Sequence, residues 1–120
     1  LIPIDCKPMA FISVATLVDT VVAVSEEYER PIGLLALPTF FERTTVARDV
    51  LTAIKDRFDE SGTLPPVHKN TRLVEAFLAR QTIFEYDRAA LGAVDYLRVA
   101  KELTNDLPEV EVRGRSRRTR

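Results

Sequence analysis

The side chains best suited to ligand chemistry lie in two segments, residues 39–48 and 67–72. Four of them are basic: Arg43, Arg48, Lys69 and Arg72. An arginine stays charged at physiological pH, and its planar guanidinium can form paired hydrogen bonds with phosphate oxygens without reading a base. Side chains of these types can contact phosphate groups, but their spacing alone does not specify a nucleic acid. The simpler interpretation is that the two loop arginines at 43 and 72 pair with Glu42 and Glu75.

Covalent and metal chemistry have few candidate residues. The chain has one cysteine, Cys6, and one histidine, His68, which excludes a disulfide framework and a zinc site built from several such ligands. Cys6 stands at a predicted strand end, where a buried structural thiol is more typical than a nucleophile. We therefore assign no catalytic residue and no metal ligand. The cysteine content favours a reducing, cytoplasmic setting.

A phosphate-binding loop needs clustered glycines, because several backbone N–H groups must converge on the anion, with a lysine and a hydroxyl just after them. The glycines here are Gly33, Gly62, Gly92 and Gly114, and neighbouring members of this set are at least 22 residues apart. Neither a P-loop nor a dinucleotide-binding fingerprint is present in this sequence.

Composition and charge divide the chain into two parts. With 120 residues, 46% of them apolar, the chain can form one core or half of a larger one. The last eight residues carry five arginines, and because the net charge is −1, the preceding part carries −6. We predict a domain over residues 1–107 and a basic tail over residues 108–120. Such a tail could bind nucleic acid or be a disordered, solvated terminus.

Apolar periodicity predicts strands that alternate with helices. Strands are expected at residues 1–4 and 32–37, with a weaker candidate at 64–67, and residues 82–86 are expected to be extended. Helices are expected over residues 9–28, from Thr44 or Thr45 to about 59, over 72–79 and over 89–103. Polar residues interrupt the apolar stretch 9–24, which is shorter than the ~20 residues that span a membrane. We predict a buried helix of a soluble protein there.

This order of elements predicts an α/β fold with a parallel sheet and helices on both faces. The first strand would leave one sheet edge open, and open edges attract further strands. Because the sequence also begins inside that strand without an initiator methionine, we expect an upstream portion to complete the fold.

The chain resembles the C-terminal half of a ParA-type partition ATPase. Residues 37–44 (Leu-Pro-Thr-Phe-Phe-Glu-Arg-Thr) match the family's apolar strand leading into Thr-x-Tyr-Asp-x-Arg-Thr. Residues 67–76 (Val-His-Lys-Asn-Thr-Arg-Leu-Val-Glu-Ala) match Ile-Pro-Arg-Asn-Val-Arg-Leu-x-Glu-Ala. Tyr86-Asp87 and residues 92–96 (Gly-Ala-Val-Asp-Tyr) match the segments that follow. The similarity spans the chain to about residue 107.

The resemblance implies a P-loop NTPase (ParA-like) fold whose ATP-bound form is a sandwich homodimer. Such a protein binds ATP with Mg²⁺ and non-specific DNA, and a ParB-like centromere-binding partner stimulates its hydrolysis. The implied location is the cytoplasm, in association with the nucleoid, and no membrane is involved. The family's phosphate loop and metal ligands lie in its N-terminal half, so this chain alone would be inactive as an ATPase.

The resemblance also implies site residues. The family's DNA-contacting arginines match Arg43 and Arg72, and Lys69 and Arg48 could extend that patch. The family's adenine pocket lies near the ends of its two later strands, at the carboxyl edge of the sheet. It maps onto six residues: Thr39, Phe40, Val67, His68, Lys69 and Asn70.

The sequence departs from the family pattern at several positions. His68 replaces the usual proline, and Arg80 and Thr82 replace a glycine and a proline. Two alternatives stay open: a non-enzymatic module that binds DNA or protein without ATP, and a MinD-like positioning ATPase. The cargo, whether plasmid, chromosome or protein cluster, is not specified by these residues.

Overall fold

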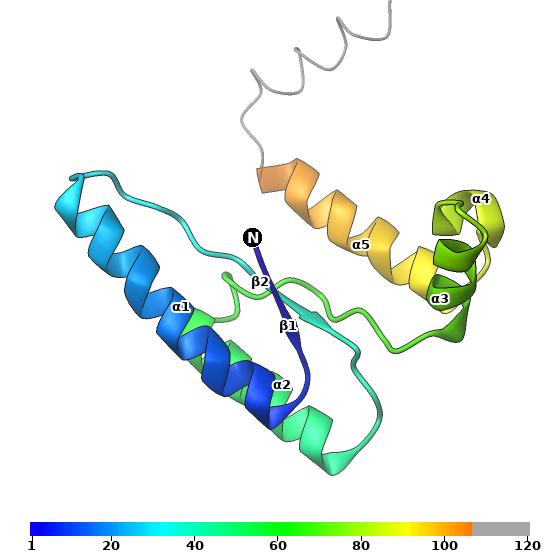
Figure 1. Ribbon diagram of the computed structural model, residues 1–120, viewed down its shortest axis with the longest axis horizontal. Coiled ribbons are helices and arrows are strands. Elements are labelled where there is room, and N and C mark those ends of the chain that lie inside the picture. Colours follow the sequence, from blue (N-terminus) through cyan, green and yellow to red (C-terminus); the bar gives the residue numbers. More distant parts are fainter. Residues whose placement is uncertain (107–120) are drawn as a thin grey trace, which may run out of the picture.

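The computed structural model describes residues 1–106 and has a mixed α/β architecture (Figure 1). Its elements, in chain order, are β1 (Ile2–Asp5), α1 (Pro8–Glu27), β2 (Ala36–Thr39), α2 (Thr45–Phe58), α3 (Thr71–Leu78), α4 (Ile83–Tyr86) and α5 (Leu91–Asp106). The predicted tail, residues 108–120, lies outside the described residues. The α/β class is confirmed, and the four longer helices lie close to their predicted ranges.

The sheet is parallel and short. In β1 and β2, Ile2 lies opposite Ala36 and Asp5 opposite Thr39. A third segment follows the other edge of β2, where the Val67 N–H donates to the Pro38 carbonyl over 2.9 Å. Only isolated parallel bridges form along this segment, at residues 63 and 68, and not the strand expected at 64–67. The two prolines at 65 and 66 cannot donate to a ladder, which explains the interruption.

Strand β2 lies later in the sequence than predicted, at Ala36–Thr39 instead of residues 32–37. Residues 32–35 would have to pair with β1 on that edge of β2. Pairing with β1 begins only where Ile2 lies opposite Ala36. Pro38 fits inside the strand because its missing N–H faces the third segment, where pairing is already interrupted. The strand therefore ends at Thr39, directly before the loop that begins with Phe40.

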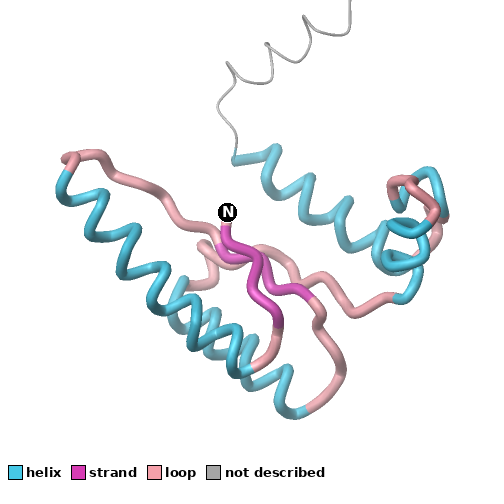
Figure 2. The backbone as a smooth tube through the Cα atoms, viewed as in Figure 1, coloured by secondary structure: helices cyan, strands magenta, loops and turns pink. Residues whose placement is uncertain are grey.

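Helices cover both faces of the sheet, as Figures 1 and 2 show. On one face, Ala36 of β2 packs with α1 and α2 in a cluster that includes Val18 and Ile54. On the opposite face, Leu37 packs with Val99 of α5. This alternation is the period-two pattern of a strand buried on both sides.

Helix α1 is much less buried than predicted. Val18 is its one fully buried residue, and the side chains of Met9 and Ile12 are 73% and 61% exposed. It packs on β1 and α2 through Phe11, Val14 and Val18. By length and composition it is the one helix of residues 1–106 that could cross a membrane, a test that core helices of soluble proteins also pass.

The segment predicted to be extended at residues 82–86 is helix α4. The Thr82 hydroxyl accepts from the Glu85 backbone N–H over 3.1 Å, and the Glu85 carboxylate accepts from the Thr82 N–H over 3.2 Å. This reciprocal capping box stabilises the first turn of a helix. Its buried residue, Ile83, packs with α3 and α5 in a small core of its own.

Candidate functional site

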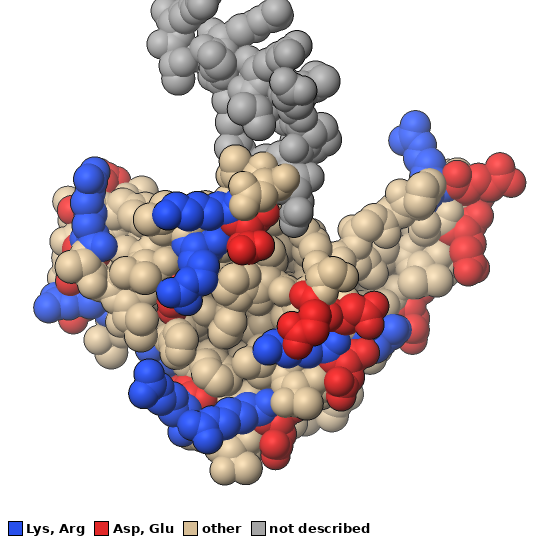
Figure 3. Space-filling model, turned by 180° about the vertical axis from the view of Figure 1, so that it is seen from behind, with Lys and Arg blue, Asp and Glu red and all other residues tan. Residues whose placement is uncertain are grey.

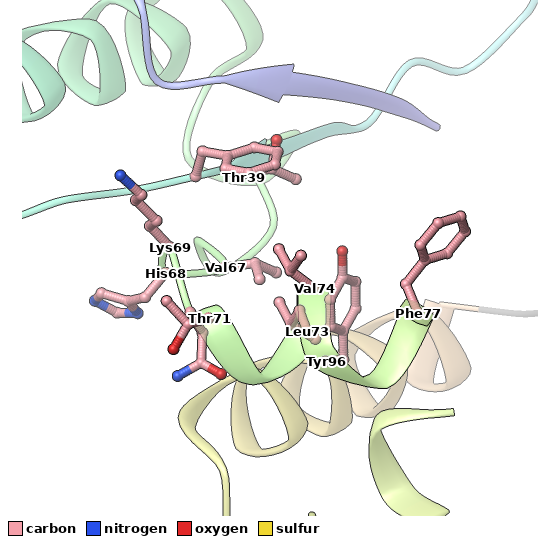
Figure 4. A pocket seen from close by; sticks show the side chains of 11 residues that line it. Thr39, Val67, His68, Lys69, Thr71, Leu73, Val74, Phe77 and Tyr96 are labelled. Atoms are coloured by element: carbon pink, nitrogen blue, oxygen red, sulfur yellow. The ribbon is translucent and has the colours of Figure 1, made fainter. Parts of the chain in front are cut away.

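A pocket of about 340 Å³ opens at the carboxyl end of β2, between the loop after that strand and helix α3 (Figure 4). Eleven residues line it: Thr39, Phe40, Val67, His68, Lys69, Asn70, Thr71, Leu73, Val74, Phe77 and Tyr96. Most of its surface is apolar. The carboxyl ends of parallel strands are a common place for ligand sites, because loops diverge there and leave a crevice.

The structure brings together all six residues predicted for the adenine pocket. They come from two segments about 28 residues apart in the chain, which meet because the third segment runs beside β2. The Phe41 N–H donates to the Val67 carbonyl over 3.0 Å, and the Lys69 N–H donates to the Phe41 carbonyl over 3.0 Å. These backbone bonds fix residues 67–69 alongside the loop that carries Phe40.

Five lining residues were missed by the sequence reasoning. Four of them belong to α3: Thr71, Leu73, Val74 and Phe77, and the fifth is Tyr96 of α5. The apolar members of α3 recur at three- and four-residue steps, a pattern that also describes an ordinary core-facing helix. Since Phe77 is 80% exposed, the α3 face is only partly used for core packing. Periodicity alone does not distinguish a pocket wall from a core.

Phe40 has an unusual backbone for an aromatic residue. Its φ is 50°, in the left-handed region that costs about 1–2 kcal/mol for a residue with a β-carbon. Three other non-glycine residues with positive φ directly follow or closely follow helices, where this conformation is common. Phe40 instead follows a strand, and its ring, half exposed, forms part of the pocket wall. Strained residues of this kind cluster at ligand sites.

His68 is held by a buried carboxylate. The Asp95 side chain, 1% exposed, accepts at the same Oδ2 atom from the His68 backbone N–H over 2.9 Å and lies 2.9 Å from His68 Nδ1. Because a carboxylate only accepts, Nδ1 carries the hydrogen in this arrangement. The Phe41 ring packs edge-on against the imidazole, with centroids 5.3 Å apart.

Two buried side-chain oxygen atoms at the His68–Asp95 contact and next to it lack a hydrogen-bond partner within the described part of the chain. They are Asn70 Oδ1 and Asp95 Oδ1. Asn70 occupies the N-cap position of α3, yet its side chain makes no capping bond. Both atoms have almost no solvent-accessible surface, so neither faces the open pocket.

The predicted DNA-contacting residues do not form one free cationic patch. Lys69 Nζ lies 3.3 Å from Glu42 Oε1. Arg72 lies 3.0 Å from Glu75 and 3.5 Å from Asp87, and the hydrogen bond with Glu75 is the main cause that raises the pKa of Arg72. For Arg72, the simpler interpretation of a loop arginine paired with Glu75 therefore describes the observed contact.

Arg43 and Arg48 differ from the other two basic residues. Both are exposed, and neither has a carboxylate partner among residues 1–106. Figure 3 shows the face seen from behind, where basic side chains form separate groups with acidic ones between them. Of the four residues predicted to contact DNA, these two are the ones that could bind a phosphate without first losing a carboxylate partner.

Among the described residues, neither the cysteine nor a metal-binding cluster belongs to the pocket. Cys6 is buried, and burial followed by the charge of Asp5 raises the pKa of its thiol to about 11. A thiol of this kind is unreactive at neutral pH. Within residues 1–106 no group of three or more His, Cys, Asp or Glu side chains could hold a metal ion.

Comparison with protein-family models and with curated proteins finds no match to this chain. The resemblance to the ParA family therefore depends on the motifs in the sequence.

Proposed function

We propose that this chain forms the adenine pocket and part of the DNA-contacting surface of a ParA-type partition ATPase. The observation that carries the proposal is the convergence of six residues, chosen from sequence motifs alone, on one pocket of about 340 Å³. In this proposal the intact protein binds ATP with Mg²⁺, dimerises in the ATP state, binds DNA non-specifically and responds to a ParB-like partner. It acts in the cytoplasm, in association with the nucleoid.

The pocket's size and chemistry support a purine base as the ligand. Its volume is near the lower end of the ~300–1,000 Å³ range of ligand sites, which suits a base-sized group. The aromatic side chains of Phe40, Phe77 and Tyr96 supply flat apolar surface for a heterocycle.

Phosphate binding would be supplied elsewhere. The sequence contains no glycine cluster, so hydrolysis requires a phosphate loop and metal ligands outside these 120 residues. In the proposed protein, Arg43 and Arg48 contact DNA phosphates from the loop and the first turns of α2. Lys69 lines the pocket, and Arg72 lies beside it in the first turn of α3. Both would have to exchange their present carboxylate partners for phosphate.

The same pocket also fits the alternative of a non-enzymatic module. A base pocket that needs no phosphate loop could bind a nucleoside without any hydrolysis. DNA binding separates the two: in a ParA-type protein ATP strengthens DNA binding, whereas a stand-alone module binds equally with and without nucleotide. Filter binding of the intact protein to duplex DNA at several salt concentrations, with and without ATP, measures this difference.

Base binding is tested by titrating the ¹⁵N-labelled chain with adenosine, ATP and guanosine and following amide chemical shifts. We expect adenosine to bind with a Kd of about 1 mM, as befits a small ligand in a half-open pocket. ATP should bind about equally to this chain, because no loop here cradles its phosphates. Shift changes should be concentrated at residues 39–40 and 67–77. An absence of adenosine binding, or shifts far from these residues, would overturn the proposal.

A further inference from the structure

The wall of the pocket formed by residues 67–70 is held from two sides. On its inner side it is bonded to Phe41 through the carbonyl of Val67 and the N–H of Lys69, each over 3.0 Å. The N–H of His68, between them, points away from that ladder and donates to Asp95 of α5. Asp95 therefore connects the outer side of residues 67–70 to helix α5 through a hydrogen bond.

Burying the side chain of Asp95 in α5 costs free energy. A carboxylate that is 1% exposed loses its hydration, and its nearest cation, Arg98, lies 3.9 Å away from Oδ1 with an exposed side chain. That oxygen has no hydrogen-bond partner in the described residues. An apolar residue at this position of α5 would avoid the cost of burying a charge. The directional bonds to His68 are what the carboxylate adds.

The position of Asp95 links two opposite parts of the pocket. The next residue, Tyr96, lines the pocket from α5, and His68 lines it from the third segment. A bond from Asp95 to His68 therefore sets the spacing between the Tyr96 wall and the 67–70 wall. The two residues are 27 positions apart in the chain, so this spacing is not fixed by local backbone structure.

We propose that Asp95 is a positioning residue of the base pocket, which acts through His68 to hold residues 67–70 at the distance from Tyr96 that admits a flat base. The inference rests on the proposed function, because it gives the pocket its ligand. Asp95 itself does not line the pocket and touches no ligand.

The test compares Asp95→Leu with Asp95→Asn. Both His68 contacts are made with the single atom Oδ2, so the amide oxygen of asparagine can accept both, whereas leucine can accept neither. We expect Asp95→Leu to weaken adenosine binding about tenfold, the loss associated with one to two hydrogen bonds, and Asp95→Asn to stay within about threefold of the parent. Glu102→Leu, an exposed site further along α5, is the matched control and should change nothing.

A second readout reports on the contact itself. Exchange of the His68 amide hydrogen should accelerate at least tenfold in Asp95→Leu and remain slow in Asp95→Asn. If Asp95→Leu does not fold, Asp95→Ala replaces it under the same criteria. Binding by the parent chain with unchanged affinity in Asp95→Leu, or equal losses in the leucine and asparagine variants, would overturn this inference alone. Failure of the parent chain to bind adenosine would overturn the proposed function and this inference with it.

Discussion

Gly92 at the start of α5 lies against Leu73 of α3 so closely that a β-carbon at position 92 would come within 2.6 Å of Leu73 Cγ. Leu73 in turn lines the pocket and packs with the cores on both sides of it. This close approach lets α3 and α5 form one corner of the molecule. The glycine is therefore required by the packing of helices, without any need for a positive φ.

We expect Gly92→Ala to lower the free energy of unfolding by about 1–2 kcal/mol, because the added methyl group must displace Leu73 in a packed corner. Urea unfolding measures the loss. In a Leu73→Ala background the clash is absent, so the same change should cost almost nothing, and the cycle should give a coupling energy of about 1 kcal/mol or more. Gly33→Ala, where a β-carbon meets nothing within 4 Å, is the control. Equal effects at positions 33 and 92 would contradict the close approach.

The strained backbone of Phe40 predicts that glycine and alanine at this position differ in stability but not in adenosine binding. Phe40→Gly should be about 1 kcal/mol more stable than Phe40→Ala, because glycine adopts a φ of 50° without penalty. Both variants lose the ring that lines the pocket, so both should bind adenosine at least fivefold more weakly than the parent chain. Thermal unfolding and the adenosine titration give the two quantities. An alanine variant that equals the glycine variant in stability would show that the left-handed backbone is not retained in solution.

Arg43 lies just before α2 and Arg48 in its first turn, whereas Arg57 lies in its last turn, so the proposed surface predicts unequal roles in DNA binding. Arg43→Ala and Arg48→Ala should each reduce the slope of log K against log salt by about 1, as expected when one phosphate contact is lost. Arg57→Ala, in the last turn of α2, should leave the slope unchanged. Filter binding to an unrelated duplex measures all three. Equal losses at all three positions would indicate a general charge effect without a defined surface.

The contacts of Arg72 predict a stability change that depends on the substituent. Arg72→Glu would place a third carboxylate beside Glu75 and Asp87 and should be less stable to unfolding than Arg72→Gln in low salt. Half-molar salt should remove most of the difference, because exposed charges are screened. Urea unfolding at two salt concentrations tests this. A difference that persists in high salt would mean that the contact is not mainly electrostatic.

Burial of Cys6 predicts a loss of stability at high pH. Its pKa is raised from 9.0 to about 11, so the folded chain keeps the thiol proton where the unfolded chain releases it. Stability from this group is complete below pH 9 and falls as the pH rises towards 11, by about 2–3 kcal/mol in total. Cys6→Ala should lack this component, so the two chains should diverge above pH 9 in urea unfolding. Parallel profiles would contradict the raised pKa.

The sequence contains a local signal for helix α4 that favours a helix over an extended segment at residues 82–86. The signature Thr82-x-x-Glu85 is a capping box before an apolar pair, so helix α4 was recognisable without coordinates. The β-branched and aromatic residues of this segment favour an extended backbone, and the capping box outweighs that preference. For α1 the period was recognised correctly, but periodicity reports which residues are apolar and not whether anything covers them.

The candidate site shows the same division between local and tertiary information. The six pocket residues follow from two sequence motifs and from the rule that ligands bind at the carboxyl ends of parallel strands. The pairing of His68 with Asp95 was not predictable, because either residue alone is typical of an exposed loop or helix face. The carboxylate partners of Lys69 and Arg72 were also not predictable, because several acidic residues lie near them in the sequence.

By itself the sequence determined the class of the fold, the approximate helix ranges and the absence of a phosphate loop. These follow from periodicity, capping residues and glycine spacing, all of which are local properties of a chain. The tertiary structure decided the end points of β2, the exposure of α1, the strain at Phe40 and the burial of Asp95. Each depends on which segments are adjacent in space, and such long-range packing is not encoded in the spacing of neighbouring residues.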